Sequence, residues 1–242
     1  MKNLIDTEWL EKNLDDVKIL DGSWHLPTTN RNAQEEFKKK HIKNSIFFDI
    51  DKNSDRNTSL PHMLPEKKNW EKIISNLGIK NNDHIIVYDD SDVHSACRVW
   101  YSFMYFGHNE NLVSVLDGGL KKWKKEKRPL TDKVKQIEKS NYIADENKSM
   151  VVDKDQINLN IEKKLFELID ARSNQRFLGL QPEMRSNLRS GNIKGSKNIP
   201  YTELINDNFT FKSKDEIISL FKKNKVNINK KLVFTCGSGI TA

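Results

Sequence analysis

The chain has 242 residues, a length that suits one large domain or two compact ones. Hydrophobic residues make up 36% of it and charged residues 31%, a balance that supports a packed core and excludes a wholly disordered chain. Two cysteines are too few for a disulfide framework or a four-thiolate metal site, and the six histidines show no metal-ligand spacing. We therefore expect neither a metal nor an organic cofactor.

The sequence contains no candidate membrane segment. No apolar stretch approaches the roughly 18 residues that span a bilayer, and residues 1–6 hold no apolar block of the kind found in signal peptides. We therefore expect a cytoplasmic protein without a membrane partner.

The net charge of +7 raises the question of a nucleic-acid partner. Only 8 of the 41 basic residues are Arg, and Lys is spread along the chain in short runs such as 38–40, which are typical of solvated helix faces. Aromatic and basic residues do not interleave as they do in single-strand-binding proteins. We expect no nucleic-acid partner, and a flat salt dependence in a DNA titration would exclude that alternative.

Apolar runs rich in Ile and Val alternate with amphipathic stretches, a pattern typical of a parallel sheet flanked by helices. The expected elements, in chain order, are an amphipathic helix at 67–77, a strand at 85–88, a helix at 95–106, a strand at 112–116, a helix at 120–127, an amphipathic helix at 214–223 and a strand at 231–235. The sequence therefore predicts an α/β fold.

Three segments of the first half have counterparts about 150 residues later in the chain. The pairs are Ile19-Leu20-Asp21 with Leu168-Ile169-Asp170, His41-Ile42-Lys43-Asn44-Ser45 with Asn192-Ile193-Lys194-Gly195-Ser196, and Ile86-Val87-Tyr88-Asp89 with Val233-Phe234-Thr235-Cys236. A nearly constant separation indicates two copies of one domain. We predict a first domain at 1–130, a polar linker at 131–150 and a second domain at 151–242.

The second copy is shorter than the first. After Asp89 the first copy continues through a helix, a strand and another helix, whereas only residues 237–242 follow Cys236. A parallel sheet that lacks a strand leaves backbone groups unpaired and an apolar face uncovered. We therefore expect the 242 residues to be a truncated form, or to take the missing part from another chain, and an inactive fragment is one of the alternatives.

Cys236 follows the predicted strand at 231–235 and opens the run Cys-Gly-Ser-Gly-Ile-Thr-Ala. A strand followed by a glycine-rich turn presents a bowl of backbone N–H groups, which stabilises an anion at its centre. Such surroundings lower the pKa of a cysteine from about 8.5 toward neutrality, and the thiolate is the nucleophilic form. Cys236 is therefore a candidate nucleophile, while Cys97, inside an apolar helical stretch, is expected to be structural.

Further motifs occur in the same order along the chain. They are Asp21-Gly22-Ser23-Trp24, His62-Met63-Leu64-Pro65, Val115-Leu116-Asp117-Gly118-Gly119-Leu120, Asp170-Ala171-Arg172, Arg176-Phe177, Pro182-Glu183-Met184-Arg185 and Cys236-Gly237-Ser238-Gly239-Ile240-Thr241-Ala242. With these motifs the chain resembles, over essentially its whole length, the tandem-domain sulfurtransferases of the rhodanese family, and most of all the 3-mercaptopyruvate sulfurtransferases.

The resemblance implies two rhodanese-fold domains, of which only the C-terminal one carries the catalytic cysteine, with the site between them. It implies that the Cys236 thiolate takes a sulfur atom from a small-molecule donor as a persulfide. It also implies that Ser238, His62 and Asp51 form a relay that manages the proton of the donor thiol or the enolate of the leaving pyruvate.

A donor carboxylate calls for a cation, and a guanidinium offers bidentate geometry that Lys cannot. Four of the eight arginines fall between 172 and 189. The resemblance assigns the substrate-binding pair to Arg176 and Arg185 and leaves Arg172 and Arg189 with structural roles. The substrate-binding residues that it places in the cysteine loop are Gly237, Gly239, Ile240 and Thr241.

The loop residues also bear on the choice of donor. Relatives that prefer thiosulfate carry basic residues where this chain has Gly237 and Ser238. A neutral loop with a hydroxyl suits a ketoacid thiol, so we expect 3-mercaptopyruvate as donor, with thiosulfate as the alternative, and a thiol such as thioredoxin or a small thiol, or cyanide, as acceptor. Cysteine phosphatases need an Arg six positions after the cysteine, where Ala242 stands, so that class is disfavoured.

Overall fold

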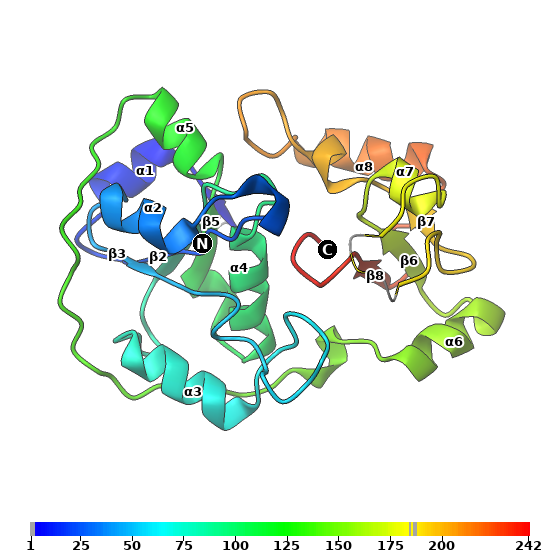
Figure 1. Ribbon diagram of the computed structural model, residues 1–242, viewed down its shortest axis with the longest axis horizontal. Coiled ribbons are helices and arrows are strands. Elements are labelled where there is room, and N and C mark those ends of the chain that lie inside the picture. The colour runs from blue at the N-terminus through cyan, green and yellow to red at the C-terminus, as the bar shows by residue number, and fades with distance from the viewer. Residues whose placement is uncertain (1–2, 184, 186–187) are drawn as a thin grey trace. The chain divides into compact units, whose positions relative to one another are not determined.

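The computed structural model describes residues 3–183, 185 and 188–242. The chain forms two compact units, drawn as ribbons in Figure 1. The first consists of Met1–Lys148 and Asn208–Thr210, and the second of Ser149–Asp207 and Phe211–Ala242. Each unit contains a parallel sheet with helices packed on it, which confirms the predicted α/β class.

The first unit is built on a five-stranded sheet in the order β1-β5-β4-β2-β3, and all of its strand pairs are parallel. The strands are β1 (Leu4–Ile5), β2 (Lys18–Asp21), β3 (Ser45–Phe47), β4 (Ile85–Tyr88) and β5 (Val113–Leu116). β4 and β5 are buried along their whole length, as expected of strands with neighbours on both edges and helices on both faces. Both were predicted from their apolar runs.

Helices cover both faces of this sheet: Figure 1 shows α1 and α5 on one side and α3 and α4 on the other. The helices are α1 (Thr7–Lys12), α2 (Ala33–Lys39), α3 (Lys67–Asn76), α4 (Ala96–Tyr105) and α5 (Gly119–Lys125). Leu10 and Trp123 pack with Ile86 in one apolar cluster. Trp70 packs edge-on against Phe103, with ring centroids 5.1 Å apart. The helices predicted at 67–77, 95–106 and 120–127 are confirmed within two residues at each end.

The segment predicted as the linker, 131–150, packs largely along the first unit. Thr131 pairs with His41 in an antiparallel bridge. Tyr142 is 2% exposed, and its backbone N–H donates to the Ser75 hydroxyl at 3.0 Å. Although most of the segment is polar, Tyr142 is an aromatic residue, and burial of its ring holds the segment against the first unit.

The second unit contains a three-stranded parallel sheet in the order β7-β6-β8. Its strands are β6 (Glu167–Asp170), β7 (Lys197–Asn198) and β8 (Leu232–Thr235), and its α-helices are α6 (Lys154–Lys163), α7 (Asn174–Phe177) and α8 (Lys214–Lys223). β6 lies between its neighbours as β2 lies between β3 and β4. Among the described residues no strand pairs with the outer edge of β8, and Phe234 is 42% exposed there, whereas β4 is covered by β5.

The core of the second unit is small. Phe221 of α8 packs with Ile169, Ile199 and Val226. The helix begins at a capping box, in which the Ser213 side chain accepts the Glu216 N–H while the Glu216 side chain accepts the Ser213 N–H. The remaining short elements are the 3₁₀ turns η1 (Pro27–Thr29), η2 (Glu110–Leu112), η3 (Lys148–Met150) and η4 (Tyr201–Leu204).

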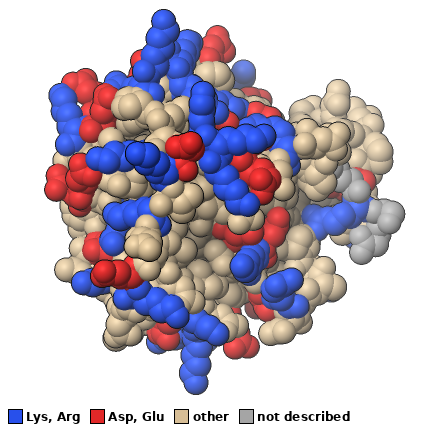
Figure 2. All heavy atoms as spheres, turned by 60° about the vertical axis from the view of Figure 1, so that its left-hand side comes forward, with Lys and Arg blue, Asp and Glu red and all other residues tan. Residues whose placement is uncertain are grey.

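The surface carries charges of both signs. On the face shown in Figure 2, acidic side chains lie among the more numerous basic ones. In the part of the chain that the structure describes, no helix has the length and apolar character needed to cross a membrane.

Candidate functional site

Cys236 stands directly after β8, at the carboxyl end of its strand. Residues 237–242 curl back in a series of bends and form no helix. Gly239 has a φ of +74°, in the left-handed region that glycine tolerates, and its backbone N–H donates to Cys236 Sγ at 3.1 Å. The predicted bowl of amides is therefore present, but the loop itself forms it.

The loop stabilises the cysteine as an anion. Burial raises the pKa of the Cys236 thiol, but hydrogen bonds from the Thr241 hydroxyl and from the backbone N–H groups of Ser238, Thr241 and Ala242 lower it by more. The resulting pKa lies below the ordinary value for a cysteine. Ile240, 4% exposed, anchors the loop in the unit, and Cys236 itself is half-buried. These contacts favour the nucleophilic thiolate.

Both arginines predicted to bind substrate lie against this loop. Arg185 Nη2 donates to the Gly237 carbonyl oxygen. The Arg176 guanidinium approaches Gly237 so closely that a Cβ at that position would lie 3.0 Å from Nη2. A side chain at 237 would therefore displace Arg176, which gives a steric reason for glycine directly after the cysteine.

Arg172 has the structural role predicted for it. Its guanidinium contacts Asp170 at 2.6 Å and Glu183 at 2.6 Å, and it also donates to the Gly191 carbonyl oxygen at 2.8 Å. Glu183 in turn binds Arg176 at 2.5 Å. Sequence reasoning assigned no role to Glu183, although its place in the Pro-Glu-Met-Arg motif was the available signal. Among the described residues, Arg189 makes no hydrogen bond or ion pair that would indicate a role for it.

The other predicted site residues, His62 and Asp51, form a pair in the first unit. His62 Nε2 lies 2.9 Å from Asp51 Oδ1, and Trp24 Nε1 donates to both Asp51 oxygens at 3.0 Å. The hydrogen bond from His62 holds the pKa of the Asp51 carboxyl below its ordinary value; burial opposes this, and the Trp24 N–H assists it. The structure therefore places two of the three predicted relay residues together. The pairing of Ser238 with them stays a prediction.

The histidine of this pair is held from several sides. His62 has a φ of +56°, and its carbonyl oxygen accepts a hydrogen bond from Arg98 Nη2 at 2.5 Å. The Trp24 ring meets the imidazole edge-on, with centroids 5.0 Å apart. Nδ1 of His62 is buried and has no hydrogen-bond partner among the described residues. Trp24 and Arg98 are supports that sequence reasoning missed.

The first unit has its own loop at the position that corresponds to the cysteine loop. Asp89 follows β4 there, and its carboxylate accepts the N–H of Ala96 at 2.6 Å and that of Ser91 at 3.2 Å. Burial raises the pKa of Asp89 to about 7 despite these donors. Burial also raises the pKa of the neighbouring Cys97 thiol to about 12, in agreement with the structural role predicted for it.

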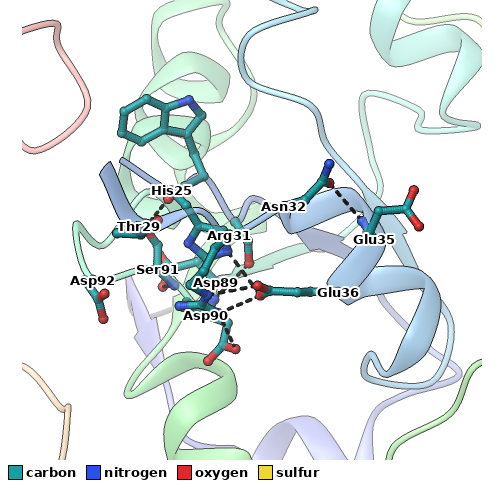
Figure 3. A network of polar contacts seen from close by, with 12 residues as sticks. His25, Thr29, Arg31, Asn32, Glu35, Glu36, Asp89, Asp90, Ser91 and Asp92 are labelled. Carbon is teal, nitrogen blue, oxygen red and sulfur yellow. Dashed lines mark hydrogen bonds and ion pairs between the residues drawn. The ribbon is translucent and has the colours of Figure 1, made fainter. Parts of the chain in front are cut away.

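Ion pairs brace this aspartate loop. Figure 3 shows Arg31 between Glu36 and Asp90. Arg31 Nη2 lies 2.5 Å from Glu36 Oε2 and 3.1 Å from Asp90 Oδ2, and Lys124 Nζ lies 2.8 Å from the same Asp90 oxygen. The aspartate loop is therefore fixed by charge pairs, whereas the cysteine loop is held by the Gly239 N–H on Sγ and by Arg185 on the Gly237 carbonyl oxygen.

A parallel α/β sheet in which a strand ends in an amide-cradled cysteine defines a class of proteins that act through a thiolate. Comparison with known proteins identifies the family. A model of the rhodanese-like domain matches residues 6–126. The chain is 39% identical to 3-mercaptopyruvate sulfurtransferase of Mus musculus and 36% identical to thiosulfate sulfurtransferase of Bos taurus, and each alignment covers 99% of this chain and 82% of the relative.

Solved structures agree with the sequence comparison. SseA from Escherichia coli superposes with a TM-score of 0.90 at 32% identity, covering 100% of this chain and 90% of that protein. Tum1 from Saccharomyces cerevisiae superposes with a TM-score of 0.89 at 28% identity, covering 99% of this chain and 86% of Tum1. The chain belongs to the rhodanese family of sulfurtransferases.

Proposed function

We propose that this enzyme transfers a sulfur atom from 3-mercaptopyruvate to a thiol acceptor through a persulfide on Cys236. The observation that carries the proposal is the cradle around Sγ, in which the loop amides and the Thr241 hydroxyl hold the thiol's pKa below its ordinary value. The same donors face a persulfide, which is also an anion, so the loop suits both forms of the enzyme.

In the first half-reaction Cys236 Sγ attacks the sulfur of the donor thiol. An S–S bond forms and the donor's C–S bond breaks, and the electron pair of that bond leaves with the carbon fragment as the enolate of pyruvate. The proton of the donor thiol is transferred to this enolate, which gives pyruvate and the Cys236 persulfide anion. In the second half-reaction an acceptor thiol takes the outer sulfur as its own persulfide and restores the thiolate.

The arginines supply the charge that the donor requires. Arg176 and Arg185 lie against Gly237, next to the nucleophile, where guanidinium groups are suited to a carboxylate. We further propose that Ser238 acts with the His62–Asp51 pair in handling the proton, as the family resemblance implies. His62 Nδ1, which has no hydrogen-bond partner among the described residues, supports that role.

Thiosulfate is the alternative donor, since relatives named thiosulfate sulfurtransferase are 36% identical over the same span. The neutral side chains at Gly237 and Ser238 favour 3-mercaptopyruvate, because a dianion would call for added positive charge in the loop. The acceptor that we propose is thioredoxin or a small thiol in the cytoplasm, with neither a nucleic acid nor a membrane as partner.

Mass spectrometry after exposure to 3-mercaptopyruvate tests the proposal. We expect the tryptic peptide that carries Cys236 to gain one sulfur atom, which a thiol reductant removes, and kcat/KM to be higher for 3-mercaptopyruvate than for thiosulfate. Absence of the adduct with both donors would support the inactive alternative. A preference for thiosulfate would reverse the assignment of the donor.

A further inference from the structure

Glu183 lies at the centre of an ion-pair cluster in the second unit. Its side chain is 4% exposed. It accepts from Arg172 Nη1 at 2.6 Å, and from Arg176 Nη2 at 2.5 Å and Nε at 3.2 Å. A carboxylate this deeply buried requires such partners, so the contacts hold Glu183 and the two arginines in one arrangement.

Arg172 serves as the anchor of this cluster. Its Nε and Nη2 contact Asp170, its Nη1 contacts Glu183, and Nη2 also donates to the Gly191 carbonyl oxygen. Asp170 is the last residue of β6, so the anchor is built on the central strand of the sheet. Arg172 therefore fixes Glu183, and each of its three guanidinium nitrogens already makes at least one hydrogen bond within the cluster.

Arg176 is held differently, because one edge of its guanidinium remains available. Nε and Nη2 bind Glu183, and two contacts with one carboxylate fix the plane of the group. Among the described residues Nη1 makes no hydrogen bond. The guanidinium lies beside Gly237, within 3.0 Å of where a Cβ would stand. Glu183 thus aims Arg176 at the cysteine loop.

Glu183 also limits the positive charge at the loop. Asp170 and Glu183 balance Arg172 and Arg176, which leaves Arg185 as the one cation of these five side chains without a carboxylate partner among the described residues. Within this group of five side chains, one positive charge is therefore unmatched. Coulomb energy scales with the product of the charges, so each added positive charge stabilises a dianion about twice as much as a monoanion.

We propose that Glu183 is a positioning residue that also determines donor specificity: it holds the Arg176 guanidinium over the cysteine loop, and its negative charge favours donors with one negative charge over donors with two. This inference rests on the proposed sulfur transfer from 3-mercaptopyruvate and names what selects that donor. Glu183 itself need not touch the substrate.

Three variants separate the two effects. Glu183→Gln keeps the shape and removes the charge, and we expect the ratio of kcat/KM for thiosulfate to kcat/KM for 3-mercaptopyruvate to rise about tenfold. Glu183→Asp keeps the charge but shortens the reach, so kcat/KM should fall for both donors and the ratio should stay the same. Glu167→Gln removes another ion pair of the second unit, with Lys197 at 2.6 Å, and is the matched control, for which neither quantity should change.

A Gln variant whose donor ratio stays within about twofold of the original would overturn the charge effect. A Glu183→Asp variant with unchanged kcat/KM would overturn the positioning effect. Failure of the proposed function is a different result: the unsubstituted protein then transfers sulfur from neither donor, whereas failure of this inference leaves it active with donor ratios that the substitutions do not alter.

Loss of a buried carboxylate can prevent folding, so one measurement uses the unsubstituted protein alone. Pyruvate carries one negative charge and sulfate carries two. Because Glu183 neutralises one arginine beside the loop, we expect pyruvate and sulfate to protect Cys236 from alkylation at concentrations within about threefold of each other, at constant ionic strength. Protection by sulfate at about tenfold or more lower concentration than pyruvate, as expected of two unmatched cations, would contradict the proposal whether or not the variants fold.

Discussion

The aspartate loop after β4 and the cysteine loop after β8 occupy corresponding places in two sheets, yet they treat an anion in opposite ways. Asp89 accepts two backbone N–H groups and is buried so deeply that its pKa rises to about 7. Cys236 is also largely enclosed, but its donors outweigh burial and its pKa falls. The number of donors relative to the desolvation decides which form of the group the loop stabilises.

The two loops also differ in what they support. Ser91 and Ser95 of the aspartate loop hold the backbone of Trp24: Ser91 Oγ donates to the Trp24 carbonyl oxygen, and Ser95 Oγ accepts the Trp24 N–H at 3.0 Å. Trp24 in turn binds Asp51. The aspartate loop therefore supports the Asp51–His62 pair through Trp24, whereas the cysteine loop carries the candidate nucleophile.

Replacing the Cys236 sulfur should have the largest effect on activity of all the substitutions that distinguish the two loops. Cys236→Ser keeps the loop but substitutes a hydroxyl, which does not form a persulfide, so sulfur transfer should fall to background, a loss of at least about a thousandfold. Steady-state assays with 3-mercaptopyruvate measure this. Cys97→Ser is the control, and it should retain activity if it folds. Substantial turnover by the Cys236→Ser variant would remove Cys236 from the mechanism.

Trp24→Phe tests the scaffold role of the first unit. The substitution keeps a ring against His62 and removes the N–H that binds both Asp51 oxygens. The pKa of Asp51 should rise toward its ordinary value, so the acid limb of the pH profile of kcat/KM should move to higher pH, with about a tenfold loss of activity. Trp9→Phe, a change of the same kind in α1, should alter neither. If the acid limb stays at the same pH, the Trp24 N–H does not control the Asp51 carboxyl, and Trp24 contributes only by packing.

Thr241→Val tests how much the Thr241 hydroxyl contributes to lowering the pKa of the Cys236 thiol. Valine has nearly the same shape but lacks the hydroxyl that helps lower the pKa of the Cys236 thiol. The thiol should titrate at higher pH, and alkylation of Cys236 near neutral pH should slow about three- to tenfold. Thr202→Val, in η4 of the same unit, is the control. Equal alkylation rates in both variants would show that the backbone amides suffice.

Asp89→Asn tests the aspartate loop through stability. The carboxyl has its ordinary pKa of 3.8 in the unfolded chain and a pKa of about 7 in the folded one, so folding takes up a proton between these limits. The free energy of unfolding therefore falls as pH rises from about 4 to about 7 and levels off above. An amide cannot titrate, so the variant should lose part of this slope, a change of at most a few kcal/mol across the window.

Tryptophan fluorescence during urea unfolding measures how the stability of the first unit, which contains Asp89, depends on pH. All five tryptophans lie in that unit: Trp9, Trp24, Trp70, Trp100 and Trp123. Asp21, whose pKa burial raises to about 6, should leave a smaller residual slope in the variant. Parallel curves for the original protein and the Asn variant would mean that Asp89 is ionised in the folded state throughout this pH range.

Much of this arrangement could be predicted from the order of the residues. The apolar runs at 85–88 and 231–235 form β4 and β8. β4 is buried along its whole length, as its continuous apolar run predicts, whereas β8 is only partly buried and Phe234 is 42% exposed. The glycines around Ser238 indicated a turn of amides, since an L side chain rarely adopts the φ of Gly239. The packing of residues 131–148 on the first unit could not be predicted from their polar composition. It depends on the burial of one aromatic side chain, Tyr142.

The sequence by itself determined the α/β class and indicated Cys236 as the candidate nucleophile with arginines to accompany it, because local periodicity and motif chemistry depend on residues close together in the chain. Only the tertiary structure revealed that Glu183 links Arg172 to Arg176 and that Trp24 binds Asp51, a residue 27 positions away. It also settled that the cysteine's anion is held by the loop's own amides. Such contacts depend on where the folded backbone brings distant side chains together, and no pattern along the chain records that distance.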